Sequence, residues 1–220
     1  MILTERGKLM YEVLFYDTID GKCPVQDFLD SLEPKILAKT LRTIDLLEAN
    51  GPLLREPYSK HIQNGLFELR TKQGSDITRV FYFFFIDQKV VLTNGFIKKT
   101  NKTPIAEKLL AQNIRMIMSG GMAMSNYRAY KEKALQNPEV KTEYDALQAE
   151  YDIIQSLIDA RANQNITQKE LSLKTGIPQA DISRIENGTR NPSLSTLKKL
   201  AQGLGMQLRL EFIPDSAKKV

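Results

Sequence analysis

Basic side chains occur at the ends of three neighbouring segments in the first half of the chain. Arg70 ends one segment of alternating residues, Arg79 begins the next, and Lys98 and Lys99 end the third. Alternate residues of a strand share a face, so Arg70 lies on the same face as Glu68. Arginines and lysines that converge on one sheet face would hold a phosphodiester and stabilise the charge that develops during its cleavage.

Other residues near these positions leave alternatives open. Strand alternation places only one of Lys98 and Lys99 on the face of Phe96, unless a bulge intervenes. An aromatic ring on that face, such as Phe96, could stack on a base. The simpler interpretation is that the basic residues are solvated strand ends, because arginine and lysine lie mostly on protein surfaces.

The elements that position these residues follow from hydrophobic periodicity and from turn residues. Alternation and short turns predict three strands in an antiparallel meander. The predicted strands and helices of the first half are strands at 11–16, 66–71, 77–86 and 90–98, and helices at 24–32, 34–50 and 104–118. The apolar run Phe81–Phe85 is interpreted as a buried central strand, because an exposed run of this kind would promote aggregation.

The second half contains a compact pattern of short helices and a tight turn. Thr167 and Glu170 have the spacing of a capping box, which marks the start of a helix. Gly176 suits a turn that needs a positive φ, and Ile182 and Ile185 face inward from the next helix. This arrangement predicts a helix-turn-helix.

A helix that enters the major groove needs short or amide side chains near its N-terminus. The predicted outward-facing residues of this helix are Gln179, Ala180, Ser183 and Arg184. Gln168 could contact phosphate or base, and Arg190 in the following loop is a candidate phosphate contact. The alternative is a small helical domain that binds protein instead.

Composition limits the classes of function. The chain has 220 residues and a formal net charge of +5, which favours a polyanionic partner without proving one. Cys23 and His61 are the only cysteine and histidine, so we expect no disulfide within the chain, no metal site and no cofactor. The N-terminus lacks a signal-peptide pattern and the longest apolar run is too short to cross a membrane, so we expect a cytoplasmic protein.

A Gly-Gly pair at 120–121 separates a mixed first half from a helical second half. Asn137 and Pro138 then open an amphipathic pattern that continues to Ile158 and predicts one helix of roughly 25 residues. Its apolar face either covers the core of its own domain or docks on the first half or on a second chain.

The helix-turn-helix resembles the Xre/Cro-type family of phage repressors and antitoxins. The matching residues run from Ile166 to Gly205. The resemblance implies binding to operator double-stranded DNA as a homodimer that forms through the C-terminal half. The alternating tail 207–213 is interpreted as a strand that could contribute to the dimer.

The first half resembles the phage-derived, HigB-like branch of the RelE toxin superfamily. The resemblance rests on Gly65–Arg70, on Arg79–Tyr82 and on Gly95–Pro104. It implies an α+β domain, with an antiparallel sheet and helices on one face, that cleaves mRNA on the ribosome without a metal ion. The reaction is attack of a ribose 2′-OH on the adjacent phosphate.

The resemblance also assigns roles to residues. Arg70 and Arg79 would grip the scissile phosphate, and Lys98 or Lys99 would assist proton transfer or charge stabilisation. Lys60 and His61 precede the first of these strands and are candidates for RNA contact, with Phe96 as the adjacent aromatic. Some members of the superfamily use a C-terminal tyrosine, which this chain lacks between Lys98 and Met118, so the acid and the base stay unassigned.

The two resemblances occur in the order of HigBA operons, toxin first. The predicted organisation is a toxin domain at 1–118, a linker or fusion joint at 119–125, and an antitoxin at 126–220 whose DNA-binding core spans 166–205. The antitoxin would bind and silence the toxin, within or between chains, by covering the arginine face or by blocking entry to the ribosome. The alternative is a transcriptional regulator whose α+β half is a non-catalytic oligomerisation or sensor module.

Overall fold

The computed structural model describes residues 10–98, 104–118 and 124–211. The chain forms two compact units, Met1–Gln155 and Ser156–Val220, which are described separately below. The fold class predicted from the sequence, an α+β domain followed by a helical domain, is confirmed. None of the described helices is both long enough and apolar enough to span a membrane.

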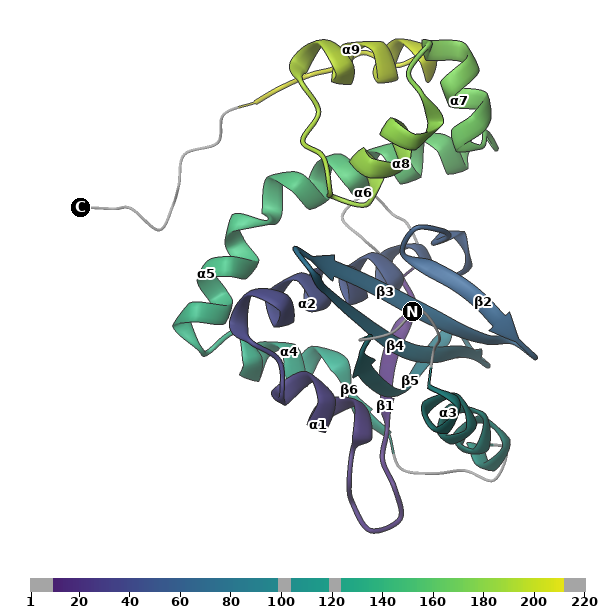
Figure 1. Cartoon of the computed structure of the whole chain (residues 1–220), viewed down its shortest axis with the longest axis vertical. Coiled ribbons are helices and arrows are strands. Elements are labelled where there is room, and N and C mark those ends of the chain that lie inside the picture. The colour runs from purple at the N-terminus through teal and green to yellow at the C-terminus, as the bar shows by residue number, and fades with distance from the viewer. Residues whose placement is uncertain (1–9, 99–103, 119–123, 212–220) are drawn as a thin grey trace. The chain divides into compact units, whose positions relative to one another are not determined.

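The first unit contains a six-stranded sheet in the order β2-β3-β4-β5-β1-β6 (Figure 1). Its strands are β1 (Glu12–Tyr16), β2 (Ser59–Gln63), β3 (Leu66–Gln73), β4 (Asp76–Phe85), β5 (Lys89–Ile97) and β6 (Met124–Asn126). β3, β4 and β5 form the predicted antiparallel meander, and β1 joins β5 in parallel. The strands β2 and β6 were not predicted from the sequence.

Two helices cover one face of this sheet. They are α1 (Pro24–Asp30) and α2 (Pro34–Asn50). The hydroxyl oxygens of Thr40 and Thr78 lie 3.4 Å apart where α2 crosses the sheet. On α1, the ring of Phe28 occupies the space where a Cβ at Gly95 would lie, at 2.1 Å, so only glycine fits at this point of β5.

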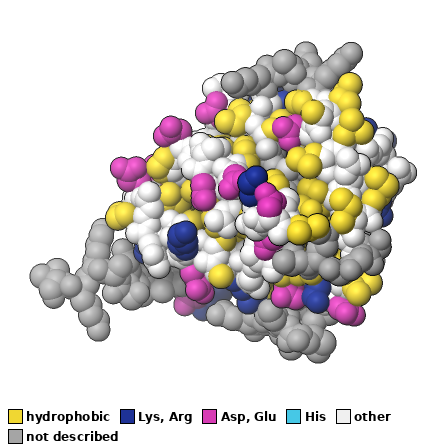
Figure 2. Space-filling model, turned by 90° about the horizontal axis from the view of Figure 1, so that it is seen from below, with side chains coloured by type: hydrophobic (Ala, Val, Ile, Leu, Met, Phe, Trp, Pro, Cys, Tyr) yellow, Lys and Arg dark blue, Asp and Glu magenta, His cyan; other side chains and the backbone are white. Residues whose placement is uncertain are grey.

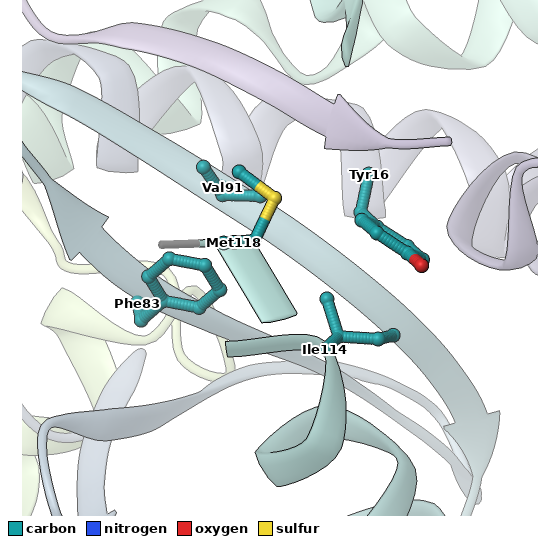
Figure 3. Close-up of a cluster of buried hydrophobic side chains, with 5 residues drawn as sticks. All are labelled: Tyr16, Phe83, Val91, Ile114 and Met118. Atoms are coloured by element: carbon teal, nitrogen blue, oxygen red, sulfur yellow. The ribbon is translucent and has the colours of Figure 1, made fainter. Parts of the chain in front are cut away.

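The helix α3 (Ile105–Ile117) packs against the opposite face. Ile114 of α3 and the adjoining Met118 contact Phe83, Val91 and Tyr16 in a buried cluster (Figure 3). Helices on one face only were predicted, and this detail is wrong. The reason is that β4 is apolar on both sides, since Phe81, Tyr82 and Phe83 are each at most 2 % exposed, so both faces require cover.

The outward side of α3 is also apolar. The exposed large hydrophobic residues of this helix are Ile105, Leu109, Leu110, Met116 and Ile117. Hydrophobic side chains gather over part of the molecular surface in the view from below (Figure 2). Among the described residues, α3 is therefore buried along its sheet-facing side alone.

Residues 124–155 belong to the first compact unit. After β6, they form α4 (Tyr127–Ala134), α5 (Pro138–Ala146) and the first half of α6 (Gln148–Asn163). The predicted long helix is interrupted at Leu147, and Asn137 caps α5 as expected. The alternative in which this region docks on the first half of the chain is confirmed, because α5 packs along α2. The predicted joint at 119–125 stays a prediction, because 119–123 lie outside the described residues.

The second unit combines the end of α6 with α7 (Gln168–Thr175), α8 (Gln179–Glu186) and α9 (Leu194–Gly203). The predicted capping box forms at Thr167 and Glu170, and Gly176 has a φ of +68°. Leu171, Ile182 and other apolar side chains form its core, as predicted from their spacing. The described part of the predicted tail strand, 207–211, has no regular structure, and the remainder lies outside the described residues.

Candidate functional sites

Two arginines from neighbouring strands meet on the α3 side of the sheet. Arg70 of β3 lies directly opposite Arg79 of β4 in the antiparallel register. Glu68 connects them, because its Oε1 atom lies 2.8 Å from Nε of Arg70 and 3.0 Å from Nε of Arg79. The predicted convergence of Arg70 and Arg79 is thus present in the structure.

The cluster is largely removed from solvent. The side chains of Glu68, Arg79 and Arg70 are 3 %, 10 % and 24 % exposed. Burial lowers the pKa of Arg79 from its ordinary value, the charge of Arg70 adds to this effect, and Glu68 opposes it. Two guanidinium groups share the buried carboxylate of Glu68, and Arg70 also lies 4.0 Å from the exposed carboxylate of Glu56. The buried groups alone therefore carry an excess of positive charge in a setting of low solvent screening, which suits an anionic ligand.

Two lysines lie near this cluster. Lys60 of β2 is paired with Glu68 across the strands, which places it on the same face, and its side chain is exposed. The backbone N–H of Lys98 donates to the carbonyl of Ile77 at 2.7 Å, which holds the end of β5 beside β4. Lys98 is half-buried, and Lys99 lies outside the described residues.

Two other predicted residues are directed elsewhere. His61 is opposite Phe67 in the register, so it lies on the other face of the sheet, with the two ring centroids 5.1 Å apart. Phe96 is opposite Arg79, but it is 8 % exposed and packs against Phe81. These placements argue against RNA contact by His61 at this cluster and against base stacking by Phe96.

The second candidate site is the outer surface of α8. Gln179, Ala180 and Arg184 are exposed and Ser183 is half-buried, whereas Ile182 and Ile185 point into the core. Gln179 and Ala180 begin the helix, where side chains reach base edges in the major groove, and Arg184 lies in its last turn.

A buried ion pair fixes α8 against its neighbours. Glu186 accepts from Nε and Nη2 of Arg161 at 2.6 and 3.0 Å, and from Nε2 of Gln168 at 2.6 Å. The amide of Gln168, predicted to contact DNA, thus donates within the domain. Gln168 remains half-exposed at the start of α7, so this bond orients a side chain that still reaches the surface.

Arg190 lies in the loop after α8 and pairs with a carboxylate of that helix. Its Nη1 atom is 2.5 Å from Oδ1 of Asp181, and Arg184 is 3.2 Å from the same oxygen. Hydrogen bonding from Arg190 lowers the pKa of Asp181. Exposed pairs of this kind contribute little to stability, so a phosphate group can replace Asp181 as the partner of Arg190.

Comparisons with known proteins agree with this division. Residues 27–116 match the family described as phage derived protein Gp49-like (DUF891), and residues 157–210 match a helix-turn-helix family. The chain carries a Gp49-like domain followed by a helix-turn-helix domain. The recognition of a phage-derived toxin-like domain and of an Xre-type domain from their motifs is confirmed.

Curated relatives match the helix-turn-helix domain. Two of them are described as uncharacterized HTH-type transcriptional regulators, y4dL of Sinorhizobium fredii and a protein of Haemophilus influenzae. They are 41 % and 43 % identical over 58 residues, which is 26 % of this chain and 30 % and 59 % of theirs. The match thus covers less than two thirds of each relative, and it supports DNA binding by the second domain.

In the Gp49-like domain, Glu68 bridges the two arginines, a role that was not predicted from the sequence. The available signal was the strand alternation that placed Glu68 on the face of Arg70. Arg79 reaches the same carboxylate because of the register between β3 and β4, which depends on the turn at Gly74. The sequence predicted a turn there, but it did not determine which residues of the two strands lie opposite each other. Among the described residues, no group of three or more histidine, cysteine or acidic side chains is placed to hold a metal ion.

The helix-turn-helix domain yields a paired prediction for DNA binding. Gln179→Ala is expected to reduce sequence preference, because an amide reads base edges. Arg190→Ala is expected to weaken binding to all sequences and to reduce the slope of log affinity against log salt by about one unit. Titration of specific and random duplexes at several salt concentrations measures both effects. An equal loss on every duplex from Gln179→Ala would assign that residue to phosphate contact instead.

Proposed function

We propose that this chain is a type II toxin–antitoxin unit. The Gp49-like domain is a ribosome-dependent mRNA endonuclease, and the C-terminal half restrains it and represses its own operon by binding operator DNA as a homodimer. The observation that carries the proposal is the pair Arg70 and Arg79 around the buried Glu68, in a chain that also has a helix-turn-helix domain. The match to a phage-derived family and the HigBA-like order support it.

The proposed reaction needs charge stabilisation more than it needs a cofactor. A ribose 2′-OH gives up its proton and attacks the adjacent phosphorus, a new 2′-O–P bond forms, and the P–O5′ bond breaks. The products are a 2′,3′-cyclic phosphate and a 5′-OH, which takes up a proton. Arg70 and Arg79 donate to the non-bridging phosphate oxygens, whose negative charge grows in the transition state. Lys60 and Lys98 extend the positive surface for the RNA backbone, and the acid and the base are left unassigned.

Expression of residues 1–118 beside the full chain tests the proposal. The short form is expected to arrest growth and to cleave translated mRNA, and the full chain is expected to do neither. Circular dichroism of the purified short form establishes that it is folded. A folded short form that neither slows growth nor cleaves mRNA would refute the toxin assignment.

A second candidate function is favoured by the names of the curated relatives. The protein would be a transcriptional regulator whose Gp49-like domain is a non-catalytic oligomerisation or sensor module. Both candidates require operator binding by the full chain. They differ in the short form, because this second candidate predicts no growth arrest from residues 1–118.

A further inference from the structure

The side chain of Asp45 on α2 is surrounded by donors from the segment that follows the Gp49-like domain. Its Oδ1 atom accepts from the hydroxyl of Tyr127 and from Nζ of Lys131, each at 2.8 Å. Its other oxygen accepts from the hydroxyl of Tyr144. Burial raises the pKa of Tyr127 and of Tyr144 far above the ordinary value, so both phenols remain protonated donors at neutral pH.

Further contacts extend along α2 on both sides of Asp45. The guanidinium of Arg42 donates twice to the carbonyl of Tyr144, at 2.8 and 3.0 Å, and lies 3.5 Å from the centre of its ring. Asn50 and Gln155 exchange two amide hydrogen bonds at 2.7 and 2.9 Å. Charged and amide side chains form an extended buried interface only when each has a partner, and these have partners from the later segment.

The same segment also adds a strand to the sheet and covers its edge. β6 pairs antiparallel with β1, and Asn126 lies opposite Leu14. The rings of Tyr127 and Tyr130 pack on Phe15, with centroids 6.0 and 5.4 Å away. Strand addition supplies backbone hydrogen bonds, and the side chains that follow it supply specificity.

The part of this interface that involves α2 lies on the other side of the sheet from the arginine cluster. α2 crosses the sheet at Thr78, whereas Arg79, the next residue of β4, points to the face covered by α3. Successive residues of a strand point to opposite faces. The hydrogen bonds described above thus join residues 124–155 to α2, on the side of the sheet away from the side chain of Arg79.

We infer that residues 124–155 are the inhibitory segment of this chain, that α2 is the surface they recognise, and that Asp45 is the contact on which their attachment depends. The helix-turn-helix domain is then dispensable for restraint. This inference rests on the proposed function, since it names the element that silences the toxin domain. It assigns restraint to a segment that binds away from the catalytic face.

Variants of the full chain test the role of Asp45. Asp45→Ala removes the carboxylate that accepts from Lys131 and from the phenol of Tyr144, and it leaves Tyr127 with the carbonyl of Leu41 as its acceptor, at 2.9 Å. Asp45→Asn keeps the shape while removing the charge. Asp145→Ala is the matched control, because Asp145 is more than half exposed and pairs only locally with Lys141. Hydrogen exchange is read separately for amides of α4 and α5, of β3–β5, and of the second unit.

The expected result is exchange in α4 and α5 that is roughly tenfold faster or more in Asp45→Ala, with a smaller effect in Asp45→Asn and none in the control. Exchange in β3–β5 is expected to be unchanged. Cells that express the Asp45→Ala chain at wild-type level are expected to stop growing, and the double variant Asp45→Ala/Arg79→Ala is expected to restore growth.

Each other outcome overturns the inference. Unchanged exchange in α4 and α5 would show that Asp45 does not hold the segment. Faster exchange without growth arrest, when residues 1–118 alone are toxic, would show that restraint lies elsewhere in the chain. If residues 1–118 are not toxic, the proposed function itself fails, and the exchange data still report whether Asp45 holds the segment.

A second full-chain variant tests whether the DNA-binding domain is dispensable. Leu171 is fully buried in the second unit, so Leu171→Asp is expected to disrupt that unit and to abolish DNA binding. Growth is expected to continue, because residues 124–155 remain attached to α2. Growth arrest by Leu171→Asp would show that restraint requires the helix-turn-helix domain.

Discussion

Arg79→Ala in residues 1–118 is expected to reduce cleavage of translated mRNA by roughly 10²- to 10³-fold, the usual effect of losing one donor to a developing oxyanion. The Arg79 side chain is 10 % exposed, and it lies beside Glu68 and opposite Arg70. A positive charge in such a setting acts on a phosphate with little screening by water. Growth and cleavage of a translated reporter mRNA measure the loss.

The variant also changes stability, so the comparison needs controls. Arg70 still pairs with Glu68 when Arg79 is removed, which limits but does not remove the cost of burying that carboxylate. Arg79→Lys keeps the positive charge but loses the planar guanidinium, which can donate two parallel hydrogen bonds to a phosphate. This variant is expected to retain part of the activity. Lys35→Ala, at an exposed position at the start of α2, removes a positive charge from a helix on the other face of the sheet. Undiminished cleavage by a folded Arg79→Ala fragment would remove Arg79 from the site.

The arginine site could be predicted in part because strand alternation is a local rule. The segments around Arg70 and Arg79 alternate and are joined by a short turn, so the sequence predicts that the two residues lie close together. The position of His61 could not be predicted in this way. It lies on β2, a short and largely polar strand with an irregular register beyond His61, and its face depends on pairing with β3. Phe96 is buried because α3 covers it, and no local pattern places α3 on that face.

The two principal helices of the Gp49-like domain show a related limit. The apolar stripe of α2 indicated which side meets the sheet. Its polar side, which includes Arg42, Asp45 and Asn50, carries no signal that it too is covered, because the partners follow about a hundred residues later in the chain. The placement of α3 could have been predicted from β4, which is apolar on both sides. A strand that is buried on both faces needs helices on both faces of the sheet.

The helix-turn-helix domain was the most predictable region, because local contacts define it. The capping box at Thr167, the positive φ of Gly176 and the inward apolar residues all lie within a few positions of the elements they shape. The pair Arg161 and Glu186 is different, because it joins α6 to the end of α8 across 25 positions. The sequence offers no periodicity that links two such residues, yet this pair connects α6 to the last residue of α8.

Glu186→Ala is expected to destabilise the helix-turn-helix domain by about 3–5 kcal/mol, the range found when one partner of a buried ion pair is removed. The Glu186 side chain is 2 % exposed and that of Arg161 is 17 % exposed, so the arginine would keep its charge with little access to water. Gln168 would lose its acceptor as well. The free energy of unfolding of a domain of this size is not much larger than this loss. We therefore expect the domain to be largely unfolded in the variant and unable to bind DNA.

Hydrogen exchange in α7–α9 and DNA titration measure this loss in the full chain. Glu186→Gln keeps the shape and one acceptor oxygen, so its effect is expected to be smaller, because the hydrogen bonds survive in part while the charge is lost. Glu211→Ala is the control, since Glu211 is 66 % exposed and its distance to Arg209 is 3.5 Å. Unchanged protection of α8 in Glu186→Ala would mean that apolar packing around Ile182 and Ile185 suffices to fix the recognition helix. If the amides of α7–α9 lose protection while those of β3–β5 keep it, the DNA-binding domain unfolds independently of the Gp49-like domain. Independent unfolding is what we expect if residues 124–155 restrain the Gp49-like domain without help from the DNA-binding domain.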